Sequence, residues 1–359
     1  MFLFGAGISV ACNPLLSTDK LTDKILTNTG ITDLDGRYVS ASINFLKRIK
    51  VEIDHYYSDI SSRLTNYEDL YYVTSQIEDS ETFNFDNPII QSFIEKIDKD
   101  INPLLENLEN IKIQELTRIA RRYIRNEIWF NLRDSQHDIL KLQLLLDAIN
   151  DKKFNKITIF TLNHDLIIED LFEEYDIKYE NGFGDEECED GNINIARFGT
   201  TRERICFIKL HGSIIWQRYS HYKIELFENE NYNSIYEDNP VFLIGTFNKM
   251  FDYTNNDIFL QLYHFFYSTL KRTNTIFISG YSFSDKGINT RLHRWMELES
   301  ENKMIVIDPN CDGFKNSARG IISLNWKDWE EKNKLLPLSN GIDKTTWEKV
   351  KEKILTTQQ

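Results

Sequence analysis

Apolar residues follow two different spacing patterns along the chain. Between residues 38 and 150 they return at steps of three and four, as at Leu116 and Ala120, and this spacing predicts a mainly helical segment. Pro88 and Pro103 are expected to break the segment into several helices. Outside it, short β-rich runs alternate with helix-like stretches, which is typical of an α/β protein. The predicted strands cover residues 1–4, 157–161, 205–210, 241–244, 275–279 and 304–307.

Short apolar strands of this kind suit a parallel sheet that helices cover on both faces. We therefore expect an α/β fold in which residues 1–37 and 151–330 form the sheet domain and residues 38–150 form a large helical insertion. Residues 331–359 are expected to be a C-terminal helical tail. Trp347 and Val350 lie on one apolar stripe of that tail, which favours docking on the chain's own domain.

Five of the predicted strands end in polar or glycine-containing turns. Ligands bind at the carboxyl ends of the strands in open α/β sheets, so these turns are expected to meet at one nucleotide-sized pocket. The turns are Gly5-Ala6-Gly7, Asn163-His164-Asp165, His211-Gly212-Ser213, Gly280-Tyr281-Ser282 and Asp308-Pro309-Asn310.

The first of these turns resembles part of a dinucleotide-binding fingerprint. Missing side chains at Gly5 and Gly7 let backbone N–H groups approach a pyrophosphate. The full fingerprint needs a third glycine at the position of Val10, and no acidic residue clearly closes a second strand. A hydride-transferring dehydrogenase is therefore disfavoured, and a tight turn without a ligand stays an equal alternative.

The next two turns carry side chains suited to catalysis. His211 is followed at once by Gly212, and histidine transfers protons near neutral pH. A purely structural histidine is the alternative. Asn163 and Asp165 precede a predicted helix, so they are either ligand-binding residues or a helix cap and a partner for the helix dipole.

Polar residues also follow the last two of these strands. Gly280 permits close backbone approach, and Ser282 offers a hydroxyl to phosphate or ribose. Asp308 could accept a hydrogen bond from an adenosine ribose. Ordinary turn chemistry explains each of them equally well.

Charge and cysteine content narrow the class of protein. The chain has 42 Lys and Arg against 56 Asp and Glu, a net charge of −14, which disfavours sequence-specific binding of nucleic acid. Its four cysteines form no C-x-x-C pair, so we expect neither a zinc module nor another metal site. No basic start of a secretory signal and no apolar run of membrane-spanning length is present. These features predict a cytoplasmic protein that does not bind membranes.

The order of the motifs resembles the sirtuin superfamily. It is most similar to the divergent sirtuin-like domains of bacterial antiphage defence, which hydrolyse NAD, and the resemblance spans residues 1 to about 310. It implies a Rossmann-like parallel sheet, NAD+ as substrate, and catalytic roles for Asn163 and His211. We expect Asp165 to orient this pair or the nicotinamide ribose. The residues that we expect to contact the pyrophosphate are Gly5, Ala6, Gly7 and Ser9, and those expected to line the adenosine end are Ser282, Asp308 and Asn310. Gly280 is expected to bind substrate by letting it approach the backbone.

Two departures separate the chain from the sirtuins that remove acyl groups from proteins. No cysteine follows Ser213 until Cys311, whereas those enzymes carry a four-cysteine zinc module there. Their Gly-Ile-Pro-x-Phe-Arg segment is replaced by residues 10–16. The predicted function is therefore NAD+ hydrolysis to nicotinamide and ADP-ribose, with protein deacylation or a non-catalytic NAD or ADP-ribose sensor as alternatives. The resemblance also implies a homo-oligomer that pairs with a HerA-type ATPase.

Overall fold

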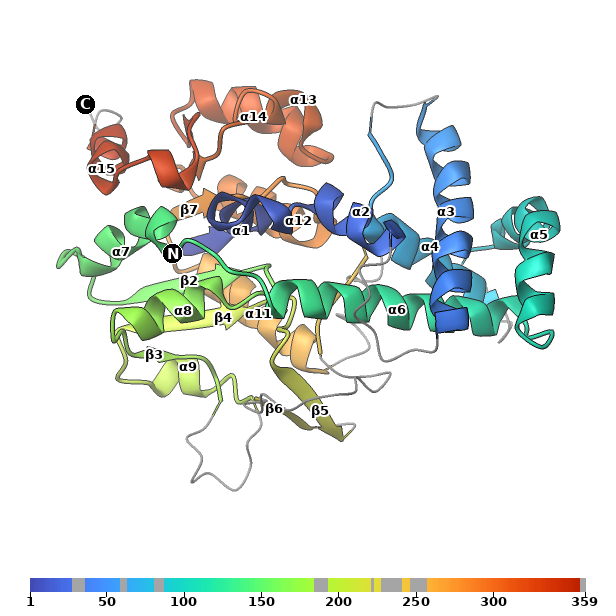
Figure 1. The fold of residues 1–359 in the computed structure, drawn as a ribbon. Coiled ribbons are helices and arrows are strands. Elements are labelled where there is room, and N and C mark those ends of the chain that lie inside the picture. Colours follow the sequence, from blue (N-terminus) through green and yellow to red (C-terminus); the bar gives the residue numbers. More distant parts are fainter. Residues whose placement is uncertain are drawn as a thin grey trace.

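The computed structural model describes residues 1–27, 36–58, 63–80, 87–183, 193–220, 223–226, 241–245 and 257–355. Its centre is a seven-stranded parallel sheet with the strand order β3-β4-β2-β1-β7-β8-β9. Figure 1 labels β2, β3, β4 and β7 of this sheet. The predicted α/β class with a parallel sheet is confirmed. The strands are β1 (Phe2–Phe4), β2 (Ile157–Thr161), β3 (Tyr179–Glu180), β4 (Ile205–Lys209), β7 (Thr275–Ser279), β8 (Lys303–Ile307) and β9 (Leu335–Leu338).

Both faces of this sheet are buried. Successive side chains of a strand point to opposite faces, so Leu3 packs into one core cluster while Phe2 and Phe4 pack into another. One face is covered mainly by helices α9 (Arg197–Thr200), α11 (Asp257–Leu270), α12 (Lys286–Leu298), α13 (Phe314–Ser317) and α14 (Ile321–Glu331). The other is covered mainly by α1 (Ala6–Cys12), α7 (Gln143–Asn150), α8 (Ile167–Glu174) and α15 (Trp347–Leu355). Burial on both sides explains why the strands read as continuous apolar runs.

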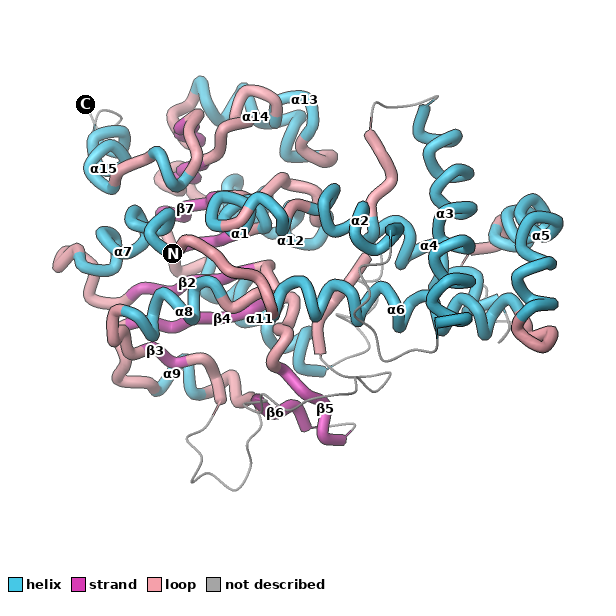
Figure 2. Tube along the Cα trace, viewed as in Figure 1, coloured by secondary structure: helices cyan, strands magenta, loops and turns pink. Residues whose placement is uncertain are grey.

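A second group of helices extends beside the sheet and has its own apolar core (Figures 1 and 2). These helices are α2 (Thr18–Thr27), α3 (Gly36–Ser58), α4 (Tyr67–Asp79), α5 (Ile90–Asn107) and α6 (Ile113–Arg133). The long helix α6 packs against α2, α3 and α4. The predicted helical content of this part of the chain is present, while the exact domain boundaries stay a prediction.

The predicted break at Pro103 is wrong, because this proline lies inside α5. A proline in a helix costs about 3 kcal/mol. Helix α5 buries Ile90, Ile94, Ile97 and Ile101 on one face, and each buried isoleucine contributes about 1.5–3 kcal/mol. Packing of this stripe therefore outweighs the loss of one backbone hydrogen bond.

Two further predictions need correction. Residues 241–244 do not form a strand of the sheet, and Phe242 makes only an isolated antiparallel bridge with Gly212. Residues 335–338, expected within a helical tail, form the edge strand β9 beside β8. Pro337 is tolerated there because one side of an edge strand needs no ladder hydrogen bonds. The rest of the tail contains the short helix η4 (Ile342–Lys344) and α15, whose Trp347 is buried against the sheet cluster.

Smaller elements complete the described chain. Strands β5 (Trp216–Ser220) and β6 (Lys223–Leu226) form an antiparallel hairpin apart from the main sheet. The short helices η1 (Pro14–Leu16) and η3 (Ile139–Leu142) flank α1. None of the helices within the described ranges is both long and apolar enough to cross a membrane.

Candidate active site

The predicted site residues meet at the point where the sheet changes its direction of winding. Strand β1 pairs with β2 on one side and with β7 on the other, so the turns after these strands flank a crevice. A cavity of about 1080 Å³ lies there, slightly above the usual range for ligand pockets. All predicted site residues line it: Gly5, Ala6, Gly7, Ser9, Asn163, Asp165, His211, Gly280, Ser282, Asp308 and Asn310.

Gly5, Gly7 and Gly280 allow two turns to touch backbone to backbone. The Gly5 N–H donates to the carbonyl of Ser279 (3.1 Å), and the Gly7 N–H donates to the carbonyl of Gly280 (2.8 Å). Gly280 has a φ of +65°, and a Cβ atom on it would lie 2.4 Å from the Ile8 nitrogen. These glycines therefore join the turns after β1 and β7, and two of the N–H groups expected to face a ligand are used within the protein.

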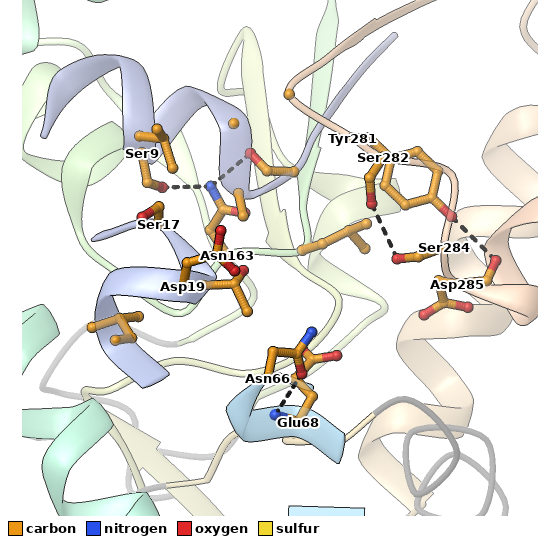
Figure 3. Close-up of a pocket in the computed structure, with 18 of the residues that line it drawn as sticks. Ser9, Ser17, Asp19, Asn66, Glu68, Asn163, Tyr281, Ser282, Ser284 and Asp285 are labelled. Atoms are coloured by element: carbon orange, nitrogen blue, oxygen red, sulfur yellow. Dashed lines mark hydrogen bonds between the residues drawn. The ribbon is translucent and has the colours of Figure 1, made fainter. Parts of the chain in front are cut away.

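Asn163 is the centre of a buried hydrogen-bond network (Figure 3). Its Nδ2 donates to the Gly5 carbonyl (3.1 Å) and to Ser9 Oγ (2.8 Å). Ser9 Oγ in turn donates to Asp165 Oδ2 (2.5 Å). Because these two partners use the amide hydrogens of Asn163, its Oδ1 is the atom that can accept a hydrogen bond from a ligand hydroxyl.

The helix-cap interpretation of Asn163 is wrong. Helix α8 begins only at Ile167, and its N-cap position is Leu166. Asp165 Oδ1 accepts a hydrogen bond from the Ile167 N–H (3.2 Å), so this carboxylate supports the start of the helix while its other oxygen holds Ser9.

Lys209, the last residue of β4, holds the Asn163-His164-Asp165 turn by a hydrogen bond to its backbone. Its buried Nζ donates to the Asp165 carbonyl and to Glu169 Oε1 (2.7 Å). Burial raises the pKa of Glu169, and the Lys209 charge opposes that rise. This role of Lys209 was not predicted from the sequence, because a lysine at the end of an apolar strand belongs to no recognisable motif.

His211 follows β4 and is only 2% exposed. Its carbonyl accepts a hydrogen bond from the Leu243 N–H (2.9 Å). Gly212 has a φ of +79°, and a Cβ atom on it would lie 2.2 Å from the Val241 carbonyl oxygen. Residues 241–244 therefore hold the turn that contains His211 in place by a backbone hydrogen bond and by close packing.

Asp285 is a site residue that sequence reasoning did not single out. Its Oδ2 lies 3.3 Å from His211 Nε2. Its Oδ1 caps α12 by accepting hydrogen bonds from the N–H groups of Gly287 (2.7 Å) and Ile288 (3.0 Å). In the sequence, an Asp that precedes a helix indicates only a helix cap. Its position beside His211 is visible only in the folded structure.

The other end of the cavity is formed by the turns after β7 and β8. Asp308 Oδ1 accepts a hydrogen bond from the Asn310 N–H (2.8 Å), and burial raises the pKa of Asp308. Ser282 Oγ donates to Ser284 Oγ (3.1 Å), and both serines are exposed. Arg319 also lines this part of the cavity, which sequence reasoning missed.

The helical segment supplies a further wall of the cavity. Asn66 caps α4 by accepting hydrogen bonds from the N–H groups of Glu68 and Asp69. Asn66 and Glu68 line the cavity together with Asp19 of α2 (Figure 3). Arg63 pairs with both carboxylate oxygens of Asp69 (2.6 and 2.8 Å). Sequence reasoning missed this wall because no local pattern places α4 opposite the sheet.

A parallel α/β sheet with a polar cavity at its switch point defines a Rossmann-like class of fold. Residues 157–332 match the family model of a SIR2-like domain, which supports a sirtuin-like family and points to NAD-dependent enzymes. The match covers Asn163, His211 and Asp285. No curated protein matches the chain.

Within the described ranges, no three His, Cys, Asp or Glu side chains gather as they would around an ion. Cys12, Cys206 and Cys311 are buried free thiols, and Cys188 lies outside the described residues.

Proposed function

We propose that the chain is an NAD+ hydrolase that cleaves the bond between nicotinamide and ribose, giving nicotinamide and ADP-ribose. The observation that carries this proposal is the convergence of Asn163, Asp165 and His211 in one cavity at the carboxyl ends of β2 and β4. The SIR2-like match over the same strands supports NAD+ as the substrate.

Cleavage of the nicotinamide–ribose bond depends more on the correct positioning of the ribose and the attacking water than on a strong nucleophile. Positive charge develops on the ribose while neutral nicotinamide departs with the electron pair of the broken bond. Asn163 Oδ1 holds a ribose hydroxyl or the attacking water. Water supplies the oxygen of the new bond to the ribose carbon, and His211 accepts the proton released from that water or from a ribose hydroxyl. Asp165 keeps Asn163 oriented through Ser9.

The remaining cavity fits an extended dinucleotide. Its volume suits a large ligand, and Arg319 lies in its lining, where a guanidinium can pair with a phosphate. Arg63 also lines the cavity, but its guanidinium is already paired with Asp69. The pyrophosphate is proposed to lie against Gly5, Ala6, Gly7 and Ser9, where the missing glycine side chains leave room although the Gly5 and Gly7 N–H groups are bonded within the protein. Gly280 is proposed to let the ligand approach the backbone, and the residues proposed for the adenosine end are Ser282, Asp308 and Asn310.

The direct test incubates the purified protein with NAD+ and separates the products by chromatography, without any acylated peptide. Equal amounts of nicotinamide and ADP-ribose are the expected result. Nicotinamide release that requires an acylated peptide would instead identify a deacylase. Binding of NAD+ with no product under any condition would identify a sensor.

We further propose that this activity serves antiphage defence by depleting NAD+ in the cytoplasm. The supporting observation is the resemblance of the motifs around Asn163 and Gly280 to those of defence sirtuins. That resemblance also supports a homo-oligomer whose hydrolysis depends on, or is changed by, a HerA-type ATPase. Light scattering and NAD+ assays with and without such an ATPase test this, and a monomer indifferent to the ATPase would contradict it.

A further inference from the structure

His211 and Asp285 come from different strand ends and meet in the interior of the site. Asp285 is 8% exposed and His211 is 2% exposed. The 3.3 Å between Asp285 Oδ2 and His211 Nε2 is an ion-pair distance when the imidazole is protonated. Two titratable groups therefore face each other with little water to screen them, which strengthens their interaction.

Capping of α12 does not account for this carboxylate. The cap uses Oδ1 alone, and a neutral Asn or Ser caps a helix about as well as Asp. A buried negative charge is costly unless it is paired. The second oxygen and the charge of Asp285 therefore exceed what the helix requires, and both are directed at His211.

The backbone around Asp285 is held in place from two sides. The Tyr281 hydroxyl lies 3.1 Å from the Asp285 carbonyl oxygen and 2.8 Å from Asn289 Oδ1. Asn289 Nδ2 donates to the carbonyl of Phe283 (2.7 Å), whose φ is +54°. A loop tied down in this way fixes the direction of the carboxylate, as a group that orients a histidine requires.

We propose that Asp285 is a positioning residue for His211: its carboxylate orients the ring and stabilises the imidazolium that forms when His211 takes a proton. This inference rests on the proposed function. The proton moves from the ribose hydroxyl or water to the imidazole, and Asp285 stays ionised throughout. Asp165, the carboxylate in the Asn163 network, accepts hydrogen bonds from Ser9 Oγ and the Ile167 N–H. It therefore does not take the place of Asp285 as the partner of His211.

The test is Asp285→Asn, which keeps an oxygen for the cap and removes the charge. We expect kcat for NAD+ cleavage to fall by about 10²-fold or more, while KM stays within about twofold. The matched control is Asp138→Asn, the same atomic change at the exposed cap of η3, outside the cavity, and it should behave like the wild type. Asp285→Ser, which caps through its hydroxyl, serves if Asp285→Asn does not fold.

A readout independent of catalysis separates this inference from the proposed function. The ¹⁵N shifts of the His211 ring, assigned by comparison with His211→Gln and measured at one pH, should change in Asp285→Asn and not in Asp138→Asn. An unchanged His211 spectrum, an unchanged kcat, or a loss confined to KM would overturn the inference. A wild-type protein that leaves NAD+ intact both alone and with the ATPase would overturn the proposed function alone, since the spectrum still tests the pair.

Discussion

Truncation of Asn163 separates its part in catalysis from its part in folding. Asn163→Ala removes two buried hydrogen bonds, to the Gly5 carbonyl and to Ser9 Oγ. Each such bond contributes about 0.5–1.5 kcal/mol, so the free energy of unfolding should fall by about 1–3 kcal/mol. A chain with an ordinary stability of about 5–15 kcal/mol stays folded after that loss. NAD+ cleavage should nevertheless be abolished, because the oxygen proposed to hold the reacting hydroxyl is gone.

The matched control for this variant is Asn302→Ala. Asn302 is also buried, and its Nδ2 donates to the Trp295 carbonyl (2.6 Å). It precedes β8 and therefore lies at the amino end of the sheet, opposite the cavity. Urea denaturation should show a similar order of destabilisation for both variants, while chromatography should show loss of product only for Asn163→Ala. Normal turnover by a folded Asn163→Ala protein would refute the assignment.

Three further predictions use the same assays. His211→Ala should lower cleavage by about 10²-fold or more while calorimetry still detects NAD+ binding; loss of binding with normal turnover per bound NAD+ would make the histidine a binding residue. Gly280→Ala should destabilise the protein by more than about 1–2 kcal/mol, because an added Cβ meets the Ile8 backbone and the φ is +65°; an unchanged urea midpoint would contradict that reasoning. EDTA should neither unfold nor inhibit the protein, and a structural loss that zinc reverses would reveal a metal site.

The sheet was largely predictable because each of its longer strands can be recognised from the residues of that strand alone. Strands buried on both faces need continuous apolar runs, and the ranges expected for β2 and β7 match the observed ones. The edge strand β9 was missed because four residues containing Pro337 carry too little pattern. Residues 241–244 have the composition of a strand, yet their partner is the turn after His211, and no local rule predicts that contact.

The candidate site was predictable only in its strand-end residues. Asn163 and His211 stand at recognisable turns, so their convergence follows from parallel pairing alone. The Ser9 link between Asn163 and Asp165 and the approach of Asp285 to His211 join residues far apart in the chain. Such contacts depend on how the loops pack, and a single sequence carries no separate signal for them.

The range that matches the SIR2-like family does not contain a complete site. It begins at residue 157, whereas β1 lies between β2 and β7 and pairs with both of them. Without β1 the two halves of the sheet lose the strand that joins them, and Asn163 loses both the Gly5 carbonyl and Ser9. The helices before residue 157 matter as well, because the Trp129 indole donates to the Ile214 carbonyl (2.9 Å), three residues beyond His211. The geometry at Asn163 and His211 is therefore a property of the sheet domain and the helical segment together.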